Sequence, residues 1–333
     1  MTRLFPLWKR ERCAMARVAR VKAQGKEGFY FITCRAAGLE GECPFDVKPF
    51  RRKLLGMIQR YSSAYFCKVY ALTIMGNHWH GVFSFEAPRE VDREELRRRA
   101  EILYPDGPLH DRLSQWTTQE WESFRDRLFD LSELMRNIQG SYALWYNKRT
   151  HHRGHLWGER FHSSLLLSHG SLLLAMIYTE LNSIRAGLVL RPELYEYATL
   201  FLREAGLDGW LEPLESLLGG NSREALREYK ASVYHLGSGP QAEGKRAISD
   251  KIFEAARKEG FSSSGALLKR LGFLSKGVVL GSREAVQEVV DLYRAKGIYT
   301  RRRNPIPQLG GALYTLTEER NPSEKAGAKA GKS

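Results

Sequence analysis

His78 and His80, separated by Trp79, are the residues with the clearest chemical potential. The apolar runs 69–74 and 82–85 lie on either side of a turn signal, so this stretch is predicted to form a β-hairpin. Side chains alternate along a strand, which puts both imidazoles on one face and the indole on the other. Two neighbouring neutral imidazoles can bind a metal ion, although partly exposed histidines without a ligand also form such pairs.

Tyr178 and Asn182 form a second chemically interesting pair, on a helix predicted over residues 171–186. Their spacing of four places them on one helical face, about one turn apart. A phenolic hydroxyl can act as a covalent nucleophile, and an amide oxygen can join two imidazoles around a divalent cation. The alternative for Tyr178 is ordinary packing in a helix core.

Strands and helices upstream must position the histidines. A strand is predicted over 29–34, a helix over 44–65 and then the hairpin, which indicates the α+β class with helices on one face of an antiparallel sheet. The histidines are expected on the face opposite those helices. A further amphipathic helix is predicted over 128–146.

Cationic and aromatic residues alternate after this helix. They are Lys148, Arg149, Arg153, His155, Trp157 and Arg160. This mixture is typical of surfaces that bind the backbone and stack the bases of single-stranded nucleic acid. For Trp157 the alternative is a core position shared with Phe161. A second basic cluster, Arg301-Arg302-Arg303, is a candidate phosphate contact.

The composition agrees with a nucleic-acid partner. The chain has 333 residues and a formal net charge of +14, which favours a polyanionic partner over a merely soluble basic protein. Its four cysteines show no metal-binding or disulfide spacing, which is typical of a reducing compartment. With no long apolar run and no secretory leader, we expect a cytoplasmic, nucleoid-associated protein without membrane contact.

Four blocks of the sequence occur in the order found in a known family. They are 31–35, Met75-Gly76-Asn77-His78-Trp79-His80, 154–161 and 178–189. Together they resemble the signatures of the single-tyrosine HUH transposases, and most narrowly the transposases associated with repetitive extragenic palindromes (REP). The resemblance covers roughly residues 15–200. The chain departs from the family pattern at Gly76 and Ser183, where the family usually has proline.

The resemblance implies a ferredoxin-like HUH nuclease core. In it His78, His80 and Asn182 would hold Mg²⁺ or Mn²⁺, and Tyr178 would cleave single-stranded, hairpin-containing DNA through a 5′-phosphotyrosine. The DNA would lie on the surface around residues 148–160 and Arg185, bound by a monomer or a homodimer. This scheme requires the histidine strand to face the tyrosine helix.

The expected organisation has four parts. A basic arm spans 1–27, the catalytic domain 28–200 with a helical insertion at about 86–130, a helical accessory domain 201–320 and a disordered tail 321–333. A helix-turn-helix for DNA binding is one possibility for the accessory domain. Met15 is a second plausible start, and Thr117 or Thr118 is the predicted cap of a helix in the insertion.

Three other functions compete with a DNA strand transferase. The first is a catalytically silent or domesticated DNA-binding protein of the same fold. The second is another HUH nuclease, such as a relaxase or replication initiator, although no phosphate-binding loop of a helicase occurs. The third is a hydrolytic metalloenzyme without a tyrosine intermediate.

Overall fold

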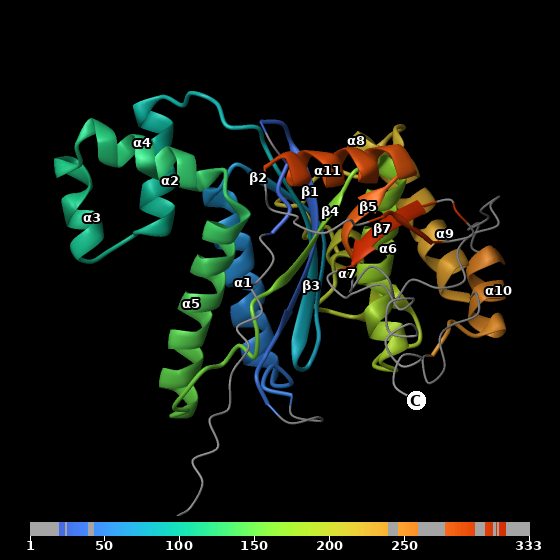
Figure 1. Ribbon diagram of the computed structural model, residues 1–333. Coiled ribbons are helices and arrows are strands. Elements are labelled where there is room, and N and C mark those ends of the chain that lie inside the picture. Colours follow the sequence, from blue (N-terminus) through green and yellow to red (C-terminus); the bar gives the residue numbers. More distant parts are fainter. Residues whose placement is uncertain are drawn as a thin grey trace, which may run out of the picture.

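The computed structural model describes residues 20–23, 25–38, 43–238, 246–258, 277–296, 304–308, 311 and 313–317. Its strands form a seven-stranded sheet in the order β2-β3-β1-β4-β5-β7-β6 (Figure 1). The strands are β1 (Gly28–Arg35), β2 (Cys67–Ile74), β3 (His78–Phe85), β4 (His162–Leu166), β5 (Gly277–Gly281), β6 (Ile306–Gln308) and β7 (Leu313–Thr317).

The α-helices are α1 (Lys48–Ala64), α2 (Arg93–Leu103), α3 (Pro108–Arg112), α4 (Thr118–Leu128), α5 (Leu131–Thr150), α6 (His169–Arg185), α7 (Thr199–Glu204), α8 (Glu215–Leu218), α9 (Ser222–Ser238), α10 (Asp250–Lys258) and α11 (Arg283–Ala295). Two 3₁₀ turns, η1 (Leu113–Gln115) and η2 (Pro192–Leu194), connect some of them. None of the helices in the described ranges has the length and apolar character needed to span a membrane.

The α+β class predicted from the sequence is confirmed, but helices cover both faces of the sheet rather than one. Helices α1 and α5 pack together on one face, and α6 packs on the other against β2 and β3, with α9 behind it (Figure 1). Neighbouring residues of β1 show the two sides, since Ile32 belongs to the core under α1 and α5 and Phe31 to the core under α6. The histidines do lie opposite α1 and α5, as predicted, but under α6.

The predicted hairpin is formed by β2 and β3, which pair antiparallel with His80 opposite Thr73. Trp79 is fully buried on the α1 side, where Leu54 and Ile58, four residues apart on α1, are also fully buried. The indole and the apolar stripe of the helix therefore fix which way the strand faces. This orientation leaves His80 on the α6 side.

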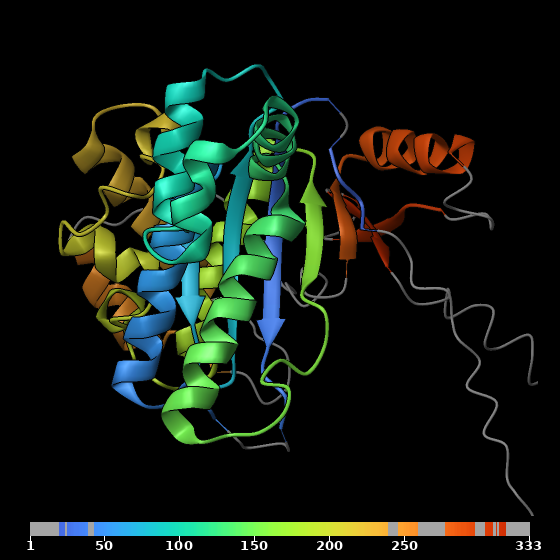
Figure 2. The same ribbon diagram turned by 90° about the vertical axis from the view of Figure 1, so that its left-hand side faces the viewer.

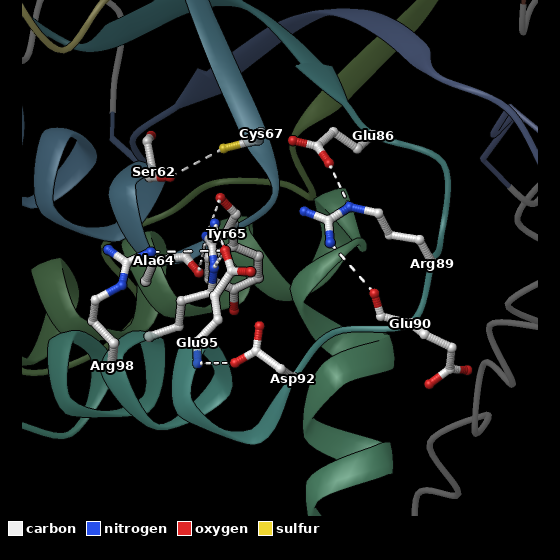
Figure 3. Close-up of polar contacts among 11 residues, drawn as sticks. Ser62, Ala64, Tyr65, Cys67, Glu86, Arg89, Glu90, Asp92, Glu95 and Arg98 are labelled. Carbon is white, nitrogen blue, oxygen red and sulfur yellow. Dashed lines mark hydrogen bonds and ion pairs between the residues drawn. The ribbon is translucent and has the colours of Figure 1, made fainter.

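The insertion folds as helices α2 to α4, as predicted, and Thr117 caps α4 with a capping box. At its base Arg89 donates to the carboxylate of Glu86 at 3.2 Å and to the carbonyl of Glu90 at 3.4 Å (Figure 3). Arg99 of α2 donates to the carbonyl oxygens that end α1. Both of these bonds, to Ala64 and Tyr65, measure 3.0 Å. Charged hydrogen bonds to the end of α1 thus attach the insertion to the core.

The C-terminal region differs most from expectation, because it contributes β5, β6 and β7 as well as helices. Strand β5 runs parallel to β4, and β7 and β6 extend the sheet beyond it (Figure 2). These strands are too short to produce a recognisable alternation in the sequence. The tail predicted over 321–333 and the cluster Arg301-Arg302-Arg303 lie outside the described residues.

The β2 edge of the sheet is covered by the chain that follows α6. The amide of Ile74 donates to the carbonyl of Tyr197 at 2.9 Å, and the amide of Leu72 donates to the hydroxyl of Thr199 at 3.0 Å. Further along, Arg203 donates to the carbonyl of Tyr70 at 3.0 Å. Strand β2 therefore has its outward backbone groups occupied by its own chain.

Within the basic arm, the structure describes residues 20–23 and 25–27, and Met15 lies outside this part. Arg20 lies over the ring of Phe161, with its Cζ atom 3.5 Å from the ring centroid. Lys22 donates to the carboxylate of Asp130 at 2.7 Å, and its backbone amide donates to the Tyr293 hydroxyl at 2.8 Å. The end of the arm is thus fixed against β4, α5 and α11.

Candidate active site

Strand β3 and helix α6 face each other, as the sequence predicted. The rings of His80 and Tyr178 meet edge to face with centroids 5.7 Å apart and an interplanar angle of 85°. Phe31 of β1 stacks on His80 at 5.5 Å and meets Tyr178 edge to face at 5.6 Å. One phenylalanine therefore fixes both candidate catalytic rings against each other.

The two histidines lie side by side, with ring centroids 5.0 Å apart. In His80 the Nδ1 atom lies 3.0 Å from the hydroxyl of Thr33, and in His78 it lies 2.7 Å from the Asn77 side-chain oxygen. When protein oxygens engage Nδ1 of both rings, Nε2 is the ring nitrogen that suits a cation.

The electrostatic environment keeps His80 neutral. Its side chain is 4% exposed, and burial, followed by the nearby charges of His78 and Arg185, holds the pKa of His80 well below its usual range. Neutral imidazole is the form that coordinates metal ions.

Helix α6 has clear start and stop signals. Ser168 caps it with a capping box, and the chain leaves the helix through Gly187 at φ +69°, with the amide of Leu188 bonded to the carbonyl of Ser183 at 3.0 Å. Glycine adopts this left-handed conformation without a Cβ penalty. The fixed ends determine which residues of α6 point at the sheet.

Tyr178 and Asn182 share the buried face of α6, as their spacing predicted. They are 8% and 9% exposed, and the amide nitrogen of Asn182 donates to the carbonyl of Tyr178 at 2.7 Å. This bond leaves the amide oxygen as the atom that suits a cation. Arg185 follows one turn later, with its Cζ atom 4.7 Å from the centre of the Tyr178 ring, and burial lowers the pKa of Arg185.

The donor atoms of His78, His80 and Asn182, two ring nitrogens and one amide oxygen, are of the types that a divalent cation accepts. Over the described ranges no group of three or more histidine, cysteine, aspartate and glutamate side chains could hold a metal ion. The candidate set is instead His78, His80 and Asn182. The strongest support for this set is that the Thr33 and Asn77 side-chain oxygens lie within hydrogen-bond distance of the two Nδ1 atoms. Hydrogen bonds of this kind orient imidazole rings that bind a metal ion through Nε2.

The predicted DNA-contact residues divide into exposed and packed ones. Lys148 and Arg149, in the last turn of α5, are exposed, as are Arg153, His155 and Arg160 in the loop that follows. The ring of Trp157 packs against Phe45 and Tyr142 with centroids 5.6 and 5.9 Å away, and its nitrogen donates to the carbonyl of Gln139 at 2.8 Å. For Trp157 these contacts favour the alternative of a packing role over base stacking.

Glu180 is a buried acidic group that the sequence interpretation did not single out. It is fully buried on α6, where its carboxylate accepts from the Thr199 hydroxyl at 2.5 Å and from the amide of Leu200 at 3.1 Å. Burial raises its pKa to about 7. The signal in the sequence was a single acidic residue within the apolar run of the helix. Glu180 ties α6 to the start of α7, and so to the segment that covers β2.

Comparisons with known proteins give a likeness to solved structures. No protein-family model matches the chain, and no curated protein matches it either. A solved structure described as "Structure of the REP associates tyrosine transposase bound to a REP hairpin" is similar to 58% of this chain and 88% of that one, with 13% sequence identity and a TM-score of 0.39.

Proposed function

We propose that this protein cleaves and rejoins single-stranded DNA through a covalent link to Tyr178. The observation that carries the proposal is the edge-to-face contact of Tyr178 with His80, which joins a potential nucleophile to a pair of imidazoles. The four sequence blocks that resemble single-tyrosine HUH transposases support the same reaction. The net charge of +14 supports DNA as the substrate.

In the proposed step the Tyr178 oxygen attacks the scissile phosphorus. The bond from phosphorus to the 3′ oxygen breaks, the phenol loses its proton, and the departing 3′ oxygen gains one. The products are a 5′-phosphotyrosine and a free 3′-hydroxyl, and attack by a 3′-hydroxyl on that linkage restores a phosphodiester. Arg185, above the phenol ring, is placed to neutralise phosphate charge that builds up during attack.

His78, His80 and the amide oxygen of Asn182 would hold Mg²⁺ or Mn²⁺. A cation bound there supplies charge neutralisation at the phosphate oxygens. The mixed nitrogen and oxygen donors suit Mn²⁺ somewhat better than Mg²⁺. Thr33 and Asn77 would orient the two imidazoles through hydrogen bonds to their Nδ1 atoms.

The test is covalent capture. Wild-type protein is incubated with Mn²⁺ and a pool of hairpin-bearing single-stranded oligonucleotides, and the adduct is mapped by mass spectrometry. Tyr178→Phe is expected to abolish the adduct while DNA binding remains within about twofold, because only the nucleophilic oxygen is lost. Tyr70→Phe, in the same core, is the matched control and should form the adduct normally.

Other outcomes separate the competing functions. No adduct from wild type over a broad pool would contradict the proposal and leave a DNA-binding protein. Cleavage that persists in Tyr178→Phe would indicate hydrolysis without a tyrosine intermediate. Capture that is unchanged by chelation with EDTA would contradict the assignment of a cation to His78 and His80.

A further inference from the structure

Three neighbouring strands place a row of polar side chains beside the candidate site. Thr33 of β1 pairs with His80 of β3 on one side and with His162 of β4 on the other. Two residues further along β1, Arg35 pairs with His78. Residues directly opposite each other on antiparallel strands point to the same face of a sheet. The 3.0 Å contact between the Thr33 hydroxyl and His80 agrees with this register.

The face that this row shares is the one covered by α6. Phe31, two residues before Thr33, packs against Tyr178 on that face. Phe31 is fully buried, Thr33 is partly exposed and Arg35 is exposed, whereas both ring nitrogens of His162 are buried. From Phe31 to Arg35 the row therefore leads from the buried contact with Tyr178 to the open surface.

The chemistry of the row suits an anion. None of these side chains is acidic, and Arg35 has no hydrogen bond or ion pair from its guanidinium to any other residue within the described ranges. Arginine offers a planar set of donors that matches phosphate oxygens. Arg185 adds a cation on the opposite, helical side of the site.

The backbone around Arg35 is held rigidly. Its carbonyl accepts from the amide of Gly158 at 3.1 Å, and the next residue, Ala36, donates to the carbonyl of Asn77 at 2.8 Å. These bonds tie the end of β1 to the turn just before His78 and to the loop predicted to bind DNA. A side chain that starts from such a fixed position loses little freedom on binding.

We propose that Arg35 binds the phosphodiester next to the one attacked by Tyr178, and so sets the register of the DNA strand in the site. This inference rests on the proposed function, which it extends by one residue that binds DNA but does not react. Both ring nitrogens of His162, on the far side of Thr33, are buried, so this histidine is not part of the contact.

The test uses a fluorescein-labelled single-stranded hairpin DNA with randomised flanks. Arg35→Ala is expected to weaken binding about tenfold and to lower the slope of log affinity against log salt by about one, as for the loss of one phosphate contact. Arg35→Lys should recover part of the affinity, and Arg227→Ala, at an exposed position of α9, should change neither quantity.

Neutral methylphosphonate linkages locate the contact along the DNA. Wild type should bind more weakly when the linkage next to the cleavage site is neutral. Arg35→Ala should bind the DNA with this neutral linkage as well as it binds the fully charged DNA. If Arg35→Ala behaves like Arg227→Ala while wild type forms its adduct, the inference fails and the proposed function stands. If wild type forms no adduct but Arg35→Ala weakens binding with the predicted salt slope, the phosphate contact stands without cleavage. Circular dichroism of each variant verifies folding.

Discussion

The two faces of the sheet are built for different purposes. On the α1 and α5 side the sheet contributes almost only large apolar residues, such as Ile32, Trp79 and Phe83. On the α6 side buried polar residues occur among the apolar ones. They include Thr73, His80, Ser84 and Ser164 on the strands and Thr179, Glu180, Asn182 and Ser183 on the helix.

This difference shows how one strand can serve stability and chemistry at once. Buried polar groups cost free energy unless they are hydrogen-bonded. On the α6 side Glu180 has such partners in Thr199 and Leu200, whereas the Thr73 hydroxyl has none among the described residues. The α1 and α5 side gains its stability mainly from apolar burial. Adjacent residues Trp79 and His80 are therefore expected to respond very differently to substitution.

The largest expected effect is that of Trp79→Ala. Removal of a fully buried indole leaves a cavity and is expected to lower the free energy of unfolding by about 3–5 kcal/mol. His80→Ala is the comparison on the other face, expected to cost less than about 2 kcal/mol because a smaller ring and one hydrogen bond are lost. Urea unfolding measures both. Equal losses of unfolding free energy in the two variants would show that both faces of the sheet contribute equally to stability.

An intermediate effect is expected for Glu180→Ala. The hydroxyl of Thr199 and the amide of Leu200 would lose their acceptor in a buried place, at a cost of about 1–3 kcal/mol in unfolding free energy. Glu180→Gln keeps one acceptor oxygen and should cost less. If alanine and glutamine variants are both as stable as wild type in urea, the polar network behind α6 does not contribute to stability.

The smallest effect on stability is expected for the double substitution of Lys148 and Arg149 by alanine. Both are exposed at the end of α5, so the free energy of unfolding should change by less than about 0.5 kcal/mol. Affinity for the hairpin DNA should nevertheless fall, and the salt slope should drop by about two. Unchanged affinity would confine DNA contact to the α6 side of the molecule.

The sequence predicted the elements that local patterns specify. Apolar runs on both sides of residues 75–77 predicted the hairpin, and the spacing of Tyr178 and Asn182 predicted their shared helical face. The helix predicted over 171–186 agrees with α6 to within two residues at each end. In each case the information lies within one or two helical turns or strand lengths of the residue concerned.

What the sequence did not predict depends on pairing between distant segments. His162 lies opposite Thr33 only because β4 pairs with β1, and the two strands are separated by more than a hundred residues in the sequence. Strand β4 itself was missed, since its five residues adjoin an apolar helix without a clear alternation. The same holds for Glu180, whose partners Thr199 and Leu200 come from a separate helix.

Because the β2 edge is covered, further strands can be added to the sheet only at its other edge. Because residues 197–203 occupy the outward side of β2, a further strand, from this chain or from another copy, has no ladder to join there. Strands β5, β7 and β6 are all attached beyond β4, at the other end. Strands β2, β3 and β1, which surround the histidines, thus keep the same neighbours whichever strands follow β4. The C-terminal strands could therefore differ between related proteins without a change in the strands around the candidate site.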